Sequence, residues 1–147
     1  EFVFEDFVAL KPNDPVRRLA KARWLLNEDA HKALRTLEDV RQMPNLTKRA
    51  LNTLNILTVQ AQFHARQWDE AEAGADVLIS DSETMAVGCM MKSLVLARKG
   101  NKDGADQWLA QADAASARHL DRNPSWINAL NREGEVVTAA VVNSYYW

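Results

Sequence analysis

The sequence predicts an all-α fold of about three antiparallel helix pairs, and three observations predict it. First, Ala71 and Ala105 lie 34 residues apart, and each follows a short polar turn. This spacing is typical of a two-helix repeat whose helices touch through a small residue. Second, helix start and stop signals recur along the chain. Third, no strand hairpin pattern appears between these signals.

The first pair begins with a strong helix signal. Asp14 precedes Pro15, which places an N-cap residue before proline at the first helical position. This combination predicts a helix through Leu26. We expect Asn27 to cap the next helix, at residues 30–41, which ends before a proline.

The second pair begins with a longer helix. Asn45 or Thr47 is expected to open it, and it runs to about Arg66. A tight turn follows, and residues 69–79 form the returning helix.

The third pair has a signal at both ends of its first helix. Ser80 is followed three residues later by Glu83, which is the pattern of a capping box. The predicted helix runs to Lys99, where Gly100 supplies a residue that tolerates positive φ. The returning helix covers residues 103 to about 120. Three full pairs are therefore expected, at residues 15–43, 45–80 and 82–122. A half pair is expected at each end of the chain.

The C-terminal segment is the most unusual part of the chain. Asn123 and Pro124 repeat the cap-and-proline signal and predict a C-terminal capping helix from Ser125. The apolar tail at residues 136–147 is either helical or extended. It is expected either to fold back over the last pair or to dock on another chain, which would give a homodimer.

This layout resembles the tetratricopeptide repeat (TPR) family over about 110 residues. The resemblance rests on two alanine-marked helix starts and one proline-containing junction: residues 68–71 with Leu78, residues 100–105 with Leu109 and Ala112, and residues 10–15. The small residue that the pattern has in each first helix is present as Ser93 and absent at Val59. The resemblance implies a right-handed superhelix whose first helices line a concave groove for a peptide or a partner helix.

Composition limits the class of protein. The chain has 147 residues and is expected to be one domain, residues 1–147. Its net charge of −2 does not favour nucleic acid as a partner. Its most apolar window, residues 85–97, is interrupted by Lys92 and is too short to insert in a membrane. The chain starts at Glu1 without methionine, so we expect a fragment of a longer protein or a processed product. The expected location is cytoplasmic, with export as the alternative.

No residue pattern points to catalysis. The three histidines, His31, His64 and His119, are far apart in sequence, and Cys89 is the single cysteine. None of them forms a metal-binding motif, and no phosphate-binding glycine loop is present. We therefore expect no catalytic residue, no metal site and no cofactor.

The helix at residues 45–66 carries the candidate partner-binding residues. At about 100° per residue, Ile56, Val59 and Phe63 form a stripe opposite the core stripe of that helix. Asn52 and Asn55 lie beside it, and their amides can bond a partner's backbone. The alternative is that this stripe only packs against neighbouring pairs.

These observations favour a non-enzymatic scaffold that binds another protein, as a peptide or a helix, in a concave groove. A second hypothesis is a regulatory or accessory domain of a larger enzyme, transporter, secretion component or transcription regulator. An enzyme is the third hypothesis, which no paired carboxylate or nucleophile–base pattern supports.

Overall fold

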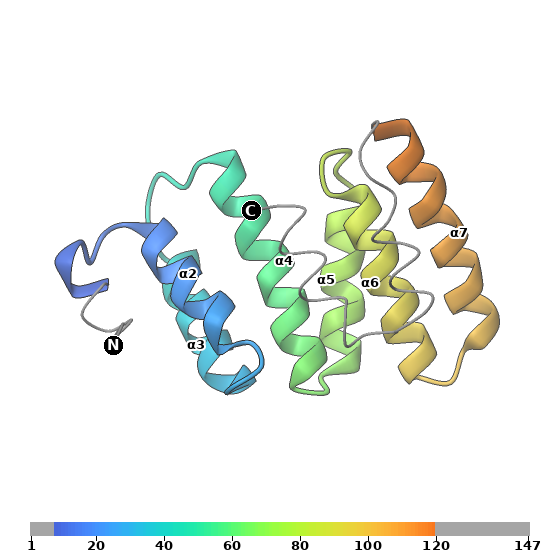
Figure 1. The fold of residues 1–147 in the computed structure, drawn as a ribbon, viewed down its shortest axis with the longest axis horizontal. Coiled ribbons are helices and arrows are strands. Elements are labelled where there is room, and N and C mark those ends of the chain that lie inside the picture. Colours follow the sequence, from blue (N-terminus) through green and yellow to red (C-terminus); the bar gives the residue numbers. More distant parts are fainter. Residues whose placement is uncertain (1–7, 120–147) are drawn as a thin grey trace. The chain divides into compact units, whose positions relative to one another are not determined.

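The structure is a computed structural model that describes residues 8–119, and it is all-α over this range (Figure 1). A short helical stretch at residues 8–10 is followed by six helices, and no strand occurs within residues 8–119. The six helices are α2 (Pro15–Leu25), α3 (Ala30–Arg41), α4 (Lys48–His64), α5 (Trp68–Ile79), α6 (Met85–Arg98) and α7 (Lys102–His119). The predicted all-α class is confirmed.

The chain divides into two compact units, Glu1–Gln67 and Trp68–Trp147. In the first unit α2, α3 and α4 pack on one another, and in the second α6 packs on both α5 and α7. The helix pairs α2–α3 and α6–α7 follow the predicted pairing. The unit boundary falls inside the predicted pair at residues 45–80, and the single domain expected for residues 1–147 stays a prediction.

Three of the predicted helix signals are confirmed. The Asp14 carboxylate accepts a hydrogen bond from the backbone N–H of Val16 at 3.0 Å and caps α2. The Thr47 hydroxyl accepts from the N–H of Ala50 at 3.0 Å, so Thr47 rather than Asn45 caps α4. Gly100, with φ +85°, follows α6. Each of these signals acts within one helical turn, which explains why sequence alone predicts them.

The prediction that Asn27 caps α3 is wrong. The cap is Asp29, whose carboxylate accepts from the N–H of Lys32 at 3.0 Å. An N-cap side chain reaches the second or third helical N–H, so the cap must immediately precede the helix. Asn27 is too far from Ala30 to do this.

The predicted capping box before α6 is also wrong. The Ser80 hydroxyl donates to the Val77 carbonyl at 2.6 Å, so it belongs to the end of α5. The helix begins only at Met85, and the Thr84 hydroxyl donates to the Leu78 carbonyl at 2.7 Å. Residues 81–84 form a bend and a turn, in which the Asp81 carboxylate accepts a hydrogen bond from the backbone N–H of Glu83 at 2.9 Å instead of capping a helix.

The core of the first unit joins α2, α3 and one side of α4. Its members are apolar side chains that are each at most 6% exposed: Leu19, Ala22, Leu25, Leu26, Ala33, Leu37, Val40, Ala50, Leu54, Leu57 and Ala61. Full burial of a large aliphatic side chain stabilises a fold by roughly 1.5–3 kcal/mol. This cluster therefore accounts for the packing of the unit.

Small residues set the close packing of α6 in the second unit. The Ser93 hydroxyl donates to the Ala105 carbonyl at 2.6 Å, and both residues are buried, as is the predicted contact residue Ala71. A Cβ added to Gly88 would lie 2.8 Å from the Leu78 Cβ, so α5 and α6 approach closely there. The sequence pattern predicts small-residue contacts at Ala71, Ser93 and Ala105 but not at Gly88.

Several predictions fall outside the described residues. These are the capping helix from Ser125, the apolar tail at residues 136–147 and the homodimer that the tail would form. Among residues 8–119, no helix combines the length and apolar character needed to cross a membrane.

Candidate functional site

Helix α4 is buried on two opposite sides. One side carries Leu54 and Leu57, which are fully buried and belong to the core of the first unit. The opposite side carries Ile56, Val59 and Phe63, the apolar residues predicted to contact a partner. A surface helix that packs on one neighbour is normally apolar on one side only. The two-sided pattern therefore indicates that α4 makes a second contact, on the side opposite the core of the first unit.

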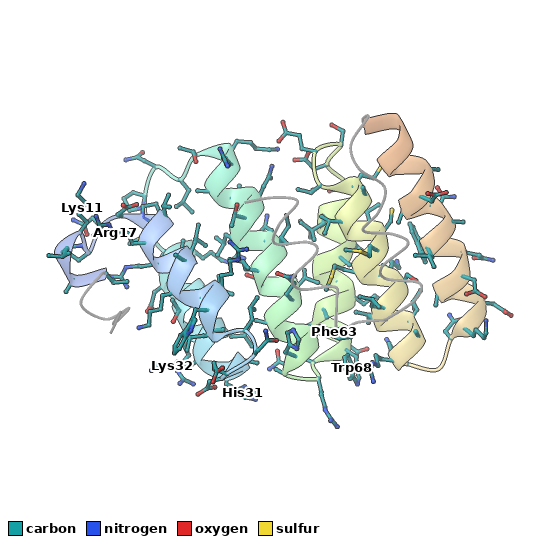
Figure 2. All side chains as sticks on the ribbon, in the orientation of Figure 1. Lys11, Arg17, His31, Lys32, Phe63 and Trp68 are labelled. Atoms are coloured by element: carbon teal, nitrogen blue, oxygen red, sulfur yellow. The ribbon has the colours of Figure 1, made fainter. Side chains whose placement is uncertain are left out.

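The three predicted apolar contacts are covered in the structure. Ile56, Val59 and Phe63 have exposed fractions of 3%, 1% and 7%, and none belongs to the core cluster of the first unit. Phe63 lies near the C-terminal end of the helix (Figure 2). The three side chains are therefore out of reach of a partner in this structure. Their role in binding stays a prediction, and so does the alternative of packing within the chain.

Gln60 lies on the same side of α4, one turn after Ile56 and nearly one turn before Phe63. Its side chain is 1% exposed, and no residue described by the structure hydrogen-bonds its Nε2 or Oε1 atom. A buried primary amide without a partner is costly, because both of its polar atoms have lost water. We call Ile56, Val59, Gln60 and Phe63 the second face of α4.

A stripe that is defined by apolar residues alone does not include Gln60. The signal that was available is a glutamine at helical spacing between Ile56 and Phe63. Such a residue is either exposed at the edge of the stripe or buried with a polar partner. In this structure it is buried without one.

The two predicted asparagines have different surroundings. The Asn55 side-chain carbonyl accepts two hydrogen bonds from the Arg41 guanidinium of α3, at 3.3 Å each. The same guanidinium donates to the Thr58 hydroxyl at 3.4 Å. Asn55 therefore ties α4 to α3 within the first unit. Asn52 is partly buried and lies one turn before Ile56.

Comparison with known proteins found no matching family model, no matching curated protein and no matching solved structure. The chemistry of the second face of α4 therefore has to be interpreted from its own residues.

His64 ends α4 next to the second face. Its ring packs edge-on against the Phe63 ring, with the centroids 6.0 Å apart. Burial lowers the pKa of His64, since the cationic form loses hydration. Burial therefore favours the neutral imidazole beside the apolar residues.

The second unit carries a ladder of ion pairs between α5 and α6. The Lys99 ammonium lies 2.7 Å from an Asp69 carboxylate oxygen and 3.0 Å from one of Glu72. The Lys92 ammonium lies 2.6 Å from Asp76 and 4.7 Å from the centre of the Trp108 ring. Ion pairs at or near the surface stabilise little. They favour one alignment of the two helices.

Among residues 8–119, no three side chains of the His, Cys, Asp and Glu types come together as a metal site would require. Cys89 is buried inside α6. The second face of α4 therefore remains the best candidate for a functional site in the described part of the chain.

Proposed function

We propose that this chain is a non-enzymatic protein-interaction scaffold of the TPR-like kind, a right-handed superhelix of helix pairs that binds a partner peptide or helix. The observation that carries the proposal is the second face of α4. It is apolar, it lies opposite the core of the first unit, and it contains a buried amide without a partner. Apolar anchors with a few polar groups are typical of protein recognition surfaces.

The two kinds of residue on this face have different roles. Ile56, Val59 and Phe63 supply apolar area, which is the main source of favourable free energy on association. Gln60 supplies the polar group that fixes the register of the partner. Asn55 is not required for this, because its carbonyl is already bonded to Arg41.

A capture experiment with two neighbouring truncations tests the proposal. The full chain is used as bait for a lysate, beside its Ile56→Ala and Leu57→Ala variants. Both side chains are at most 3% exposed, so both truncations cost about 2–5 kcal/mol of stability. Only Ile56 lies on the second face of α4.

The expected result is a lysate protein that the parent and Leu57→Ala retain and that Ile56→Ala loses. When that protein is purified and titrated, its affinity for Ile56→Ala should also be the lowest of the three. Equal binding by both variants would place recognition elsewhere. Circular dichroism checks that each variant is folded. If an alanine variant unfolds, Ile56→Val and Leu57→Val repeat the comparison at lower cost.

A further inference from the structure

Gln60 restricts the kind of segment that can bind the second face of α4. A primary amide has one carbonyl acceptor and two N–H donors. In this structure neither polar atom of Gln60 has a hydrogen-bond partner among the described residues, although the side chain is only 1% exposed. A segment that covers this face must therefore supply a donor and an acceptor side by side, or leave the amide unpaired.

An extended backbone meets this requirement. In an extended chain the N–H and the C=O of one residue point to the same side, which is how antiparallel strands exchange two bonds between a pair of residues. The Gln60 Nε2 can then donate to the carbonyl, and its Oε1 can accept from the N–H. A helical segment does not fit, because its N–H and C=O groups are bonded within the helix.

The spacing of the apolar residues also fits an extended segment. Along α4, Ile56 and Phe63 are separated by about 10 Å, at a rise of about 1.5 Å per residue. Four residues of extended chain, which are three steps of roughly 3.3 Å, span about the same distance. The third residue of such a segment can therefore pair with Gln60 while the first and the fourth lie over Ile56 and Phe63.

We infer that the partner binds the second face of α4 as an extended peptide that pairs the N–H and C=O of one residue with the Gln60 amide. The inference rests on the proposed function and makes it more specific. The peptide reaches the amide only when the covered face opens. The amide is unpaired while the chain covers it and paired when the peptide is bound, so the difference favours the bound state.

A selection of peptides tests the inference on the full chain. A phage-displayed library of random dodecapeptides is the probe, and the selected peptides are synthesised and titrated by fluorescence. Each backbone nitrogen of a selected peptide is then methylated in turn, which removes one N–H donor at a time. The protein variants are Gln60→Leu, Ile56→Ala and, as a matched control for the glutamine, Gln107→Leu, which changes an exposed glutamine of α7.

The expected result is a loss of affinity of about tenfold or more for Gln60→Leu and no loss for Gln107→Leu. One N-methyl position should weaken binding to the parent and have no further effect on Gln60→Leu. Should Gln60→Leu not fold, Gln60→Met replaces it, and the methylation scan on the parent still identifies the paired residue.

Other outcomes would overturn the inference. If Ile56→Ala abolishes binding while Gln60→Leu does not, or if bound peptides become helical by circular dichroism, the scaffold proposal stands and the extended conformation is wrong. An amide held by a buried water would give the first of these results. Peptides that are insensitive to both Ile56→Ala and Gln60→Leu, or a library that yields no ligand, would contradict both proposals.

Discussion

Replacing Gln60 with leucine should make the chain more stable. Burying an amide without a partner costs about 1–3 kcal/mol, and leucine removes both polar atoms while keeping a side chain of similar size. Since Gln60 is 1% exposed, most of this cost is present in the folded state. We expect a gain of about 1–2 kcal/mol. At about 2–4 °C per kcal/mol for a chain of this length, the melting temperature should rise by about 2–8 °C.

Thermal unfolding followed by circular dichroism measures this change, and calorimetry confirms it. The control is Gln107→Leu, which makes the same replacement at an exposed position and should change stability by less than about 0.5 kcal/mol. A fall in the melting temperature of Gln60→Leu would refute the reasoning. It would mean that the folded chain already satisfies the amide, and Gln60 would then offer nothing to a partner backbone.

Three further predictions concern packing and charge. Gly88→Ala should cost about 1–3 kcal/mol in urea unfolding, because its Cβ would lie 2.8 Å from the Leu78 Cβ; an unchanged midpoint would contradict the close approach of α5 and α6. The lowered pKa of His64 means that this side chain binds a proton more readily in the unfolded chain than in the folded one, so stability should fall as pH drops below about 6.5. Melting temperatures measured across pH should show a flatter dependence for His64→Gln than for the parent. An unchanged dependence would mean that other groups cause the loss of stability. Lys99 lowers the pKa of Asp69, so this pair stabilises above the unfolded pKa of the carboxyl and stops doing so as pH falls through the lowered value. Lys99→Met should remove that part of the acid dependence at low salt only, and the same loss at high salt would argue against an exposed ion pair.

Local features of the fold could be predicted from the sequence. Asp14 and Thr47 cap the helices they precede, and Gly100 follows α6, because each acts within one turn of the backbone. The core side of α4 could also be predicted, since its periodicity is regular. The start of α6 at Met85 was missed, because Ser80 and Thr84 bond backward to α5 carbonyls and no sequence pattern separates this from a cap.

The candidate site was predicted only in part. Helical spacing alone places Ile56 and Phe63 on one side of α4. The bond between Asn55 and Arg41 joins residues 14 positions apart on two helices, and the periodicity of one helix does not contain such a contact. The unpaired amide of Gln60 depends on every group around it, so only a three-dimensional structure shows it.

The central claim is that a partner segment lies against the second face of α4, and site-specific photo-crosslinking tests it most directly. Phe63 is replaced by benzoylphenylalanine in the full chain, which preserves an aromatic side chain at this position. The matched control places the same group at Leu51, which is 38% exposed and lies on the same helix away from that face. The account predicts that irradiation joins the partner to position 63 and not to position 51. Crosslinks to the partner from position 51 alone, or from neither position in a bound complex, would contradict it.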